Sequence, residues 1–197
     1  MKFLIALLAL FSLSAIAVET NTDAPDFTLP GLNTKVRDIS LKDFKGKIVV
    51  LEWLNHGCPF VRKHYDSGNM QALQKKYIER NVIWLSIISS APGKQGYVDT
   101  HGALKDKLNN KSAATDILLD TKGMVGRLYG AKTTPHMFII NKDGNIAYQG
   151  AIDDKADILR SSIEDAKNYV SSALEEVMNN KKVTTPTTKS YGCSIKY

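Results

Sequence analysis

The sequence predicts an α/β fold in which one central mixed β-sheet is flanked by helices. Two observations predict it. Short apolar, β-branched runs alternate with segments of helical spacing, and Asp143-Gly144 lies between two apolar runs as a hairpin turn. Alternation of strand and helix followed by a hairpin favours a single sheet with helices on both faces. A length of 197 residues suits one domain.

The expected strands are buried apolar runs bounded by turn residues. They cover 47–54, 82–88, 117–119, 137–140 and 146–150. The proline-containing segment 24–32 is typical of a sheet edge, because proline cannot donate to a ladder. A short helical turn is expected within 39–46.

The expected helices follow apolar spacings of three and four residues. They cover 59–66, 69–80, the neighbourhood of 100–110 and 120–129. The apolar positions Leu159, Ile163, Ala166, Val170, Ala173 and Val177 predict a long amphipathic helix over 159–177. Asp153-Asp154 is expected at its start, where acidic charge suits the helix dipole. Residues 180–197 are expected to form a polar C-terminal tail.

Residues 1–17 have the pattern of a cleaved signal peptide. Lys2 precedes a short apolar run, and Ala15-Ile16-Ala17 is an A-x-A cleavage site. The apolar run is short for a bilayer span. We therefore expect export to the periplasm or the medium after cleavage near Ala17, no stable membrane insertion, and a mature domain over 18–197.

The net charge of +6 comes from lysines spread along the chain, without a basic stripe interleaved with aromatic residues. This pattern is typical of a solvated surface and speaks against nucleic acid as a partner. We expect neither a cofactor nor a metal ion.

Cys58 is the candidate nucleophile. It follows a buried strand and precedes Pro59, which suits the first position of a helix. A cysteine at a helix N-terminus is stabilised as thiolate by the helix dipole. His56, Arg62 and Lys63 add basic groups nearby in the sequence. The alternative interpretation is a small buried apolar cysteine.

Two further features concern the same chemistry. Pro135 directly precedes a central strand, where it must end a loop or take the cis form in a tight turn. Cys193 is the second of two cysteines in a chain expected to be exported. Pairing of Cys58 with Cys193 is the natural hypothesis, either as a structural disulfide or as part of a redox cycle.

The opening 24–29, the segment Phe44-Lys45-Gly46-Lys47 with strand 48–53, and Thr134-Pro135 together resemble a known family. It is the redoxin branch (alkyl hydroperoxide reductase and thiol-specific antioxidant) of the thioredoxin-like superfamily. The motifs at 55–61 and 191–197 are similar to those of an exported peroxiredoxin-like subgroup. The resemblance covers about residues 24–197.

This resemblance implies a thioredoxin-like fold and a thiol-based oxidoreductase. Cys58 is expected to attack a peroxide or a disulfide of a protein or small molecule, and Cys193 to resolve the product, with an unidentified thiol as reductant. The supporting residues are expected to be Asn55, His56, Arg62, Thr134 and Pro135. Of these, Asn55 or Thr134 would orient substrate or sulfur, Arg62 with Lys63 would lower the thiol pKa, and Pro135 would be the cis-proline beside the active cysteine.

The chain departs from its relatives at two positions. Val61 stands where a C-x-x-C motif has its second cysteine, so a local dithiol is absent. Asn55 stands where typical peroxiredoxins carry threonine, and no arginine is obvious for the opposite side of the pocket, although Arg62 and Arg127 are candidates.

Two other functional hypotheses remain open. The domain is a non-catalytic module stapled by a Cys58–Cys193 disulfide, or it binds copper through Cys58 with His56 or His64, since thiolate and imidazole suit that metal. In the simplest interpretation, these histidines and His136 are surface or helix-cap residues, and Trp53 and Trp84 belong to the core.

Overall fold

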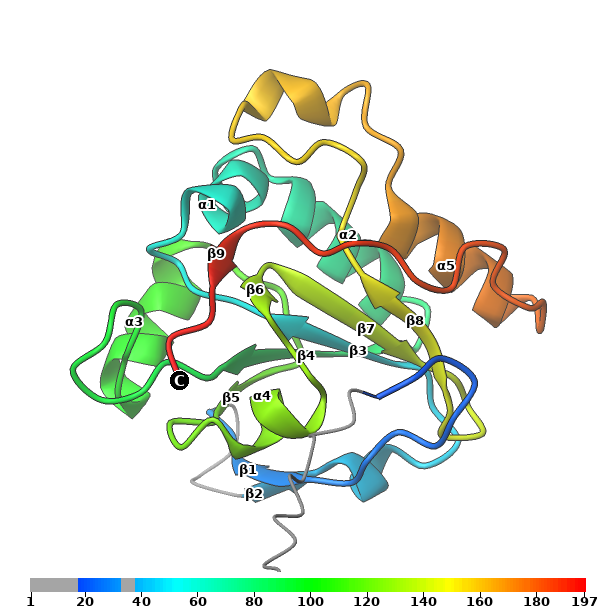
Figure 1. Ribbon diagram of the computed structural model, residues 1–197, viewed down its shortest axis with the longest axis horizontal. Helices are drawn as coiled ribbons and strands as arrows, with labels where there is room; N and C mark the ends of the chain where they lie inside the picture. The colour runs from blue at the N-terminus through cyan, green and yellow to red at the C-terminus, as the bar shows by residue number, and fades with distance from the viewer. Residues whose placement is uncertain (1–17, 33–37) are drawn as a thin grey trace, which may run out of the picture.

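The computed structural model describes residues 18–32 and 38–197. A five-stranded sheet with the order β5-β4-β3-β7-β8 forms its centre (Figure 1). β3 is parallel to β4, and β4 to β5, whereas β7 is antiparallel to both β3 and β8. The sheet is therefore mixed, as the sequence predicts.

The strands are β1 (Thr28–Pro30), β2 (Asp38–Ser40), β3 (Val49–Trp53), β4 (Ile83–Ile88), β5 (Asp116–Leu119), β6 (Thr133–Thr134), β7 (His136–Ile140), β8 (Ile146–Gly150) and β9 (Cys193–Ser194). The α-helices are α1 (Pro59–Asp66), α2 (Asn69–Ile78), α3 (Thr100–Asn109), α4 (Met124–Leu128) and α5 (Tyr169–Met178), and the 3-10 helices are η1 (Leu41–Phe44) and η2 (Arg160–Ile163).

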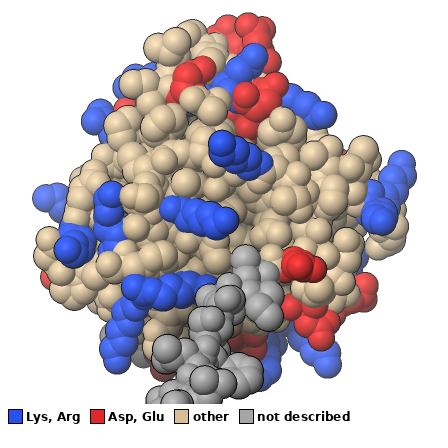
Figure 2. Space-filling model, viewed as in Figure 1, with Lys and Arg blue, Asp and Glu red and all other residues tan. Residues whose placement is uncertain are grey.

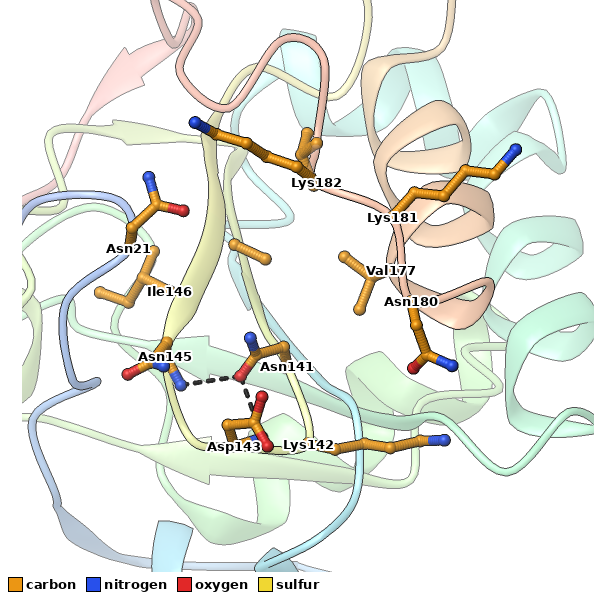
Figure 3. A pocket seen from close by; sticks show the side chains of 12 residues that line it. Asn21, Asn141, Lys142, Asp143, Asn145, Ile146, Val177, Asn180, Lys181 and Lys182 are labelled. Atoms are coloured by element: carbon orange, nitrogen blue, oxygen red, sulfur yellow. Dashed lines mark hydrogen bonds between the residues drawn. The ribbon is translucent and has the colours of Figure 1, made fainter.

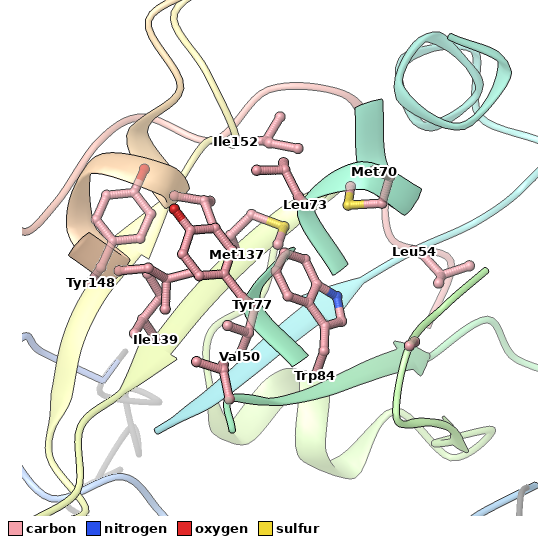
Figure 4. Close-up of a cluster of buried hydrophobic side chains, with 14 of the residues drawn as sticks. Val50, Leu54, Met70, Leu73, Tyr77, Trp84, Met137, Ile139, Tyr148 and Ile152 are labelled. Atoms are coloured by element: carbon pink, nitrogen blue, oxygen red, sulfur yellow. The ribbon is translucent and has the colours of Figure 1, made fainter. Parts of the chain in front are cut away.

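Both faces of the sheet are covered, because successive side chains of a strand point to opposite faces. In β3, Val50 belongs to a core shared with α1, α2 and α5, whereas Val49 and Leu51 belong to a core shared with α4 and the β1–β2 pair. Figure 4 shows the first core, where Trp84, Tyr77 and Met137 pack around Val50. Trp53 and Trp84 are fully buried, as predicted.

A buried carboxylate ties α1 and α2 to the sheet. Glu52 is fully buried in β3, and it accepts hydrogen bonds from Tyr65 Oη at 2.9 Å, Trp84 Nε1 at 2.7 Å and Ser86 Oγ at 2.9 Å. Gln74 Nε2 donates a further bond at 3.1 Å. Burial raises the pKa of Glu52, and these hydrogen bonds oppose the rise. The network fixes α1, whose N-cap is Cys58, relative to β3.

The split between the helices of 59–66 and 69–80 is confirmed, with Gly68 in a left-handed conformation at the break. The short helical turn at 41–44 and the Asp143-Gly144 hairpin are also found. Ile39 and Ser40, expected in the helical turn, belong instead to β2, which pairs with β1.

The helix predicted over 159–177 is wrong in its first half. α5 begins only at Tyr169, because the Asn168 side chain accepts a hydrogen bond from Ser171 N at 2.8 Å and caps the helix there. Upstream, Asp157 Oδ1 accepts from Leu159 N at 2.8 Å and starts the separate turn η2. Leu159 is 61% exposed. The apolar spacing over 159–177 therefore spans two separate helical segments and does not mark one buried helix face.

The C-terminal tail is ordered along the core domain. β9 pairs with β6, and the last residues lie beside the N-terminal end of α1 and the loop before β7 (Figure 1). The predicted signal peptide, residues 1–17, lies outside the described residues. In the described part of the chain, no helix combines the length and apolar character needed to cross a bilayer.

Lysine and arginine side chains are dispersed over the face seen in Figure 2, and acidic side chains gather at the top of this view over the segment that carries η2. The charge of this face is therefore patchy rather than uniformly basic.

A matched pair of leucine substitutions checks where the last helix begins. Leu174→Ala removes a fully buried side chain of α5 and should lower the free energy of unfolding by about 2–5 kcal/mol, whereas Leu159→Ala should change it by about 0.5 kcal/mol or less. Urea denaturation of both variants measures the difference. Equal losses would mean that Leu159 lies on the buried face of one continuous helix.

Candidate active site

Cys58 lies where the chain passes from the central strand β3 into α1. It is the N-cap of α1, and Pro59 occupies the first turn, as predicted. The turn that leads to it is closed by a hydrogen bond from Cys58 N to the Asn55 carbonyl at 2.9 Å. The sulfur is thereby held at the positive end of the helix.

The Cys58 sulfur contacts two segments that are distant in the sequence. Its thiol donates to the Thr134 carbonyl oxygen at 3.1 Å, and the sulfur accepts from the Cys193 backbone N–H at 3.3 Å. The Thr134–Pro135 peptide bond is cis, so the predicted proline feature is found beside Cys58. Cys58 has no exposed surface.

The pKa values of the two thiols are shifted in opposite directions. Burial raises the pKa of Cys58, but hydrogen bonds from the Cys193 thiol and from the N–H groups of Val61 and Cys193 outweigh burial, so this pKa lies below its ordinary value. Burial, followed by the hydrogen bond with Cys58 and the negative charge of its thiolate, raises the pKa of Cys193 to about 11. Cys58 is therefore the more readily ionised thiol.

The tail reaches Cys58 within one chain. Both cysteines are free thiols, and the backbone N–H of Cys193 lies within hydrogen-bond distance of the Cys58 sulfur. β9 and β6 pair so that Cys193 faces Thr134 across the ladder. Gly192 passes so close to the Thr134 carbonyl oxygen that a Cβ atom would lie 2.1 Å from it, and its φ of +127° also favours glycine.

Downstream of Cys193, the last residues of the tail are bonded to the core. Ile195 N donates to Lys132 O at 3.1 Å, and Ala91 N donates to Lys196 O at 2.8 Å. Tyr197 Oη donates to Ala131 O at 2.7 Å, and the Arg127 guanidinium lies 4.4 Å from the centre of the Tyr197 ring. The tail is thus fixed to the core on the C-terminal side of β9.

Asn55 shapes the loop before Cys58. It is buried, its Oδ1 accepts from Gly57 N at 2.8 Å, and its Nδ2 donates to Gln95 O at 3.4 Å. The amide therefore connects the Cys58 loop with the loop after β4.

His56 has an unusual environment for a polar ring. Neither ring nitrogen has a hydrogen-bond partner among the described residues, and the ring packs edge-on against Tyr65 with centroids 4.9 Å apart. Burial lowers the pKa of His56, and the charge of Asp106 opposes this effect. A neutral, unpartnered imidazole thus lies two residues from Cys58.

The two cations expected to lower the thiol pKa are engaged elsewhere. The Arg62 side chain is 61% exposed and lies 3.6 Å from Asp66. Lys63 is buried, and its Nζ donates to Lys155 O at 2.6 Å and lies 3.4 Å from Asp157 Oδ1. The hydrogen bonds described above, rather than these charges, lower the pKa of Cys58.

Three interpretations of polar residues are wrong. His64 and His136 are buried rather than at the surface. His64 bonds to Asn69 and Tyr191, and the Nδ1 of His136 accepts from Lys132 N. Asp153 does not start the last helix but is buried beside Lys63 and His64. Sequence reasoning missed the role of Tyr191, although it lies in the terminal motif, because its partners come from distant segments.

The described residues contain no group of three or more His, Cys, Asp or Glu side chains that could hold a metal ion.

A separate hollow lies beside the β7–β8 hairpin (Figure 3). There, the Asn141 side chain accepts from Asp143 N at 3.0 Å and Asn145 N at 2.9 Å, so it serves the turn. Ile140, which precedes this turn, pairs with Val49, so the hollow lies at the end of β3 opposite to Cys58.

The chain matches known thiol proteins in sequence. The model of the AhpC/TSA family matches residues 20–149. The thiol-disulfide oxidoreductase ResA of Bacillus thuringiensis subsp. konkukian (strain 97-27) is 29% identical over 129 residues, which cover 66% of this chain and 68% of that protein.

Solved structures confirm the predicted thioredoxin-like fold. A hypothetical protein from Sinorhizobium meliloti 1021 superposes with a TM-score of 0.77 at 21% identity, covering 92% of this chain and 96% of the other. The thioredoxin domain of a thiol-disulfide oxidoreductase from Bacteroides vulgatus gives 0.54 at 20% identity, covering 76% and 98%.

The unequal acidities of the two thiols can be measured by NMR titration of protein with ¹³Cβ-labelled cysteine, since the chain has two cysteines. We expect Cys58 to titrate below the ordinary cysteine range and Cys193 near pH 11. In Cys193→Ala the pKa of Cys58 should rise, because a donor to its thiolate is lost, and in Cys58→Ala the pKa of Cys193 should fall. The assignment is contradicted if both thiols have the same pKa and if neither pKa changes when the other cysteine is replaced.

Proposed function

Because this chain belongs to the AhpC/TSA family, a family of redoxins, we propose that it is a thiol-disulfide oxidoreductase in which Cys58 is the nucleophile and Cys193 the resolving cysteine. The observation that carries this proposal is that the Cys193 backbone N–H donates to the Cys58 sulfur at the start of a helix, which brings together two free thiols of unequal acidity. The names of the ResA relatives point to the same class of reaction.

The reaction is a two-step exchange. The Cys58 thiolate attacks one sulfur of a substrate disulfide, a mixed disulfide forms, and the other substrate sulfur leaves as a thiolate that takes up a proton. Cys193 then loses its proton and attacks the Cys58 sulfur, which forms the Cys58–Cys193 disulfide and releases the second substrate thiol. Two electrons pass to the substrate, and a thiol reductant restores the protein.

Substrate access requires the tail to move. Cys58 has no exposed surface, and β9 lies against both Cys58 and Thr134. The first step therefore needs β9 displaced, and the second step needs it back in place. Displacement also frees the backbone groups of Thr134 beside the cis Pro135, where substrate can be held.

The neighbouring residues have separate proposed roles. Asn55 holds the loop that presents Cys58, and His56 offers an unpartnered imidazole to a substrate or leaving thiolate. Arg62, which is exposed and near the N-terminus of α1, is proposed to favour acidic or anionic substrates rather than to activate the thiol.

The same pair of thiols also supports reduction of a peroxide. The Cys58 thiolate would attack the peroxide, become a sulfenic acid and release an alcohol or water, and Cys193 would then condense with the sulfenic acid and release water. Typical peroxiredoxins carry an arginine opposite the reactive cysteine, but the arginines of the described ranges 18–32 and 38–197 are engaged elsewhere. Arg62 and Arg160 pair with Asp66, Arg80 pairs with Glu175, and Arg127 stacks on Tyr197. We therefore rank a disulfide above a peroxide as substrate.

We also infer export from residues 1–17, with a mature protein that begins near Val18. In such a compartment Cys58 and Cys193 need a dedicated thiol donor to be reduced, because structural disulfides persist there.

Cysteine variants test the order of attack. Reduced protein is mixed with one equivalent of a peptide disulfide or of hydrogen peroxide, and the products are mapped by mass spectrometry. The wild type should give a Cys58–Cys193 disulfide, Cys193→Ser should accumulate a mixed disulfide at Cys58, and Cys58→Ser should lose all turnover.

The peroxide arm identifies the substrate class. Oxidation of Cys58 by peroxide no faster than that of free cysteine supports the disulfide assignment, and much faster oxidation supports the peroxidase. Turnover retained by Cys58→Ser overturns both. A reduction potential below about −300 mV identifies the pair as a structural staple instead.

Export is tested by expressing the full chain in a Gram-negative host and determining the N-terminus of the protein in the periplasmic fraction. We expect Val18 as the first residue, because cleavage follows Ala17. The matched variant Leu8→Arg, which places a charge in the apolar run, should leave the precursor uncleaved in the cytoplasm. Intact Met1 on wild-type protein recovered from the periplasm contradicts this cleavage site.

A further inference from the structure

Tyr191 lies two residues before Cys193 and connects the tail to a buried polar cluster. Its hydroxyl donates to Asp153 Oδ1 at 2.5 Å and contacts His64 Nε2 at 3.1 Å. His64 is fully buried and Asp153 is 1% exposed, so both partners are fixed by the core. At Tyr191 the tail therefore binds to buried groups of the core rather than lying on an open surface.

The hydrogen bonds of this cluster have one consistent direction. Asn69 Nδ2 can only donate, so His64 Nδ1, at 2.8 Å from it, is the acceptor and the His64 proton lies on Nε2. His64 Nε2 therefore donates a hydrogen bond to Tyr191 Oη, and the Tyr191 hydroxyl donates one to Asp153 Oδ1. Burial, with the nearby charge of Lys63, lowers the pKa of His64 to about 3, so the ring is neutral, as this chain of bonds requires.

The ring of Tyr191 is held as well as its hydroxyl. It packs against Phe60 with centroids 5.9 Å apart, and Lys63 Nζ lies 5.7 Å from its centre. Phe60, Lys63 and His64 all belong to α1, the helix that starts at Cys58. One tail residue is thus bound to the same helix that presents the nucleophile.

The site around Tyr191 also holds charge without full compensation. Asp153 Oδ2 is buried with no hydrogen-bond partner among the described residues, and lies 4.0 Å from Lys63 Nζ. Asp153 Oδ1 accepts from Lys155 N at 3.0 Å in addition to Tyr191. Loss of the Tyr191 hydroxyl would therefore remove one of few donors to a buried carboxylate, which is costly.

We propose that Tyr191, held by His64 and Asp153, is a positioning residue that seats the tail on Cys58 and so sets the balance between the closed tail, in which Cys193 can resolve, and the open tail, in which substrate reaches Cys58. This proposal rests on the proposed function for its second half, the resolving step. Its first half, the exposure of Cys58, concerns the reduced protein alone.

The balance predicts opposite effects on the two steps. Weakening the contact at Tyr191 favours the open tail, so attack at Cys58 should become faster and resolution by Cys193 slower. A merely structural defect would not separate the steps in this way.

Tyr191→Phe removes the hydroxyl alone, and Tyr77→Phe is the matched control. Tyr77 is also buried, and its substitution removes bonds to Ser171 and Glu175, but it belongs to α2 and contacts α5, away from the tail. In reduced protein, alkylation of Cys58 by iodoacetamide should be about tenfold faster in Tyr191→Phe than in the wild type and unchanged in Tyr77→Phe, since a hydrogen bond to a charged group is worth at least that factor.

The second measurement is resolution of a preformed mixed disulfide between Cys58 and a model peptide thiol. We expect about tenfold slower formation of the Cys58–Cys193 disulfide in Tyr191→Phe than in Tyr77→Phe. Rates equal to those of the control in both measurements overturn the proposal, as does slowing of both steps together. Faster alkylation of Cys58 with an unchanged rate of disulfide formation supports the positioning of the tail by Tyr191. The same result overturns a role of Tyr191 in the resolving step.

Should Tyr191→Phe fail to fold, Asn69→Ala carries the test. Asn69 is partly exposed at the start of α2 and acts on Tyr191 only through His64. Cys58 alkylation at least about twofold faster than in Tyr77→Phe supports the proposal, and an unchanged rate overturns it. Because alkylation requires no turnover, this result is independent of whether Cys58 proves to be catalytic.

Discussion

The hydrogen bond from the Cys193 backbone to the Cys58 sulfur joins the end of the chain to the start of α1, and the arrangement of the site depends on it. It lies among contacts of different kinds: the ladder between β9 and β6, the thiol bond to Thr134 and the close passage of Gly192. Of these groups, the Cys193 N–H donates to the sulfur, and together the contacts leave Cys58 without exposed surface. The Cys58 sulfur is therefore fully buried, and its pKa is nevertheless lowered.

Local sequence was sufficient for the elements that position Cys58. A β-branched run and a proline directly after the cysteine predict a strand, a turn and a helix start, and all three depend only on neighbouring residues. The break between α1 and α2 was predictable for the same reason, since Gly68 takes a left-handed conformation. The mixed character of the sheet, with helices on both faces, followed from the order of these elements and from the Asp143-Gly144 turn, whereas the order of its strands did not.

What sequence could not give was set by contacts between distant segments. Apolar spacing suggested one helix over 159–177, yet the Asn168 cap and the Asp157 turn divide it. Basic residues near Cys58 in the sequence suggested electrostatic activation, but Lys63 turns into the cluster with Asp157, and Arg62 turns to Asp66. His64 and Asp153 resemble surface residues until the tail places Tyr191 between them.

The family match ends at residue 149, so α5 and the tail with Cys193 lie beyond it. Cys58, the proposed nucleophile, thus belongs to the part of the chain that the family model matches, and the tail segment that covers it lies outside the match. Complete burial of Cys58 has a consequence for the durability of the protein. Further oxidation of a cysteine to sulfinic and sulfonic acids is irreversible for most proteins, and it needs an exposed sulfur. If the tail opens as proposed, the lifetime of this thiol is set by how seldom the last residues move away from it, more than by the intrinsic reactivity of the sulfur.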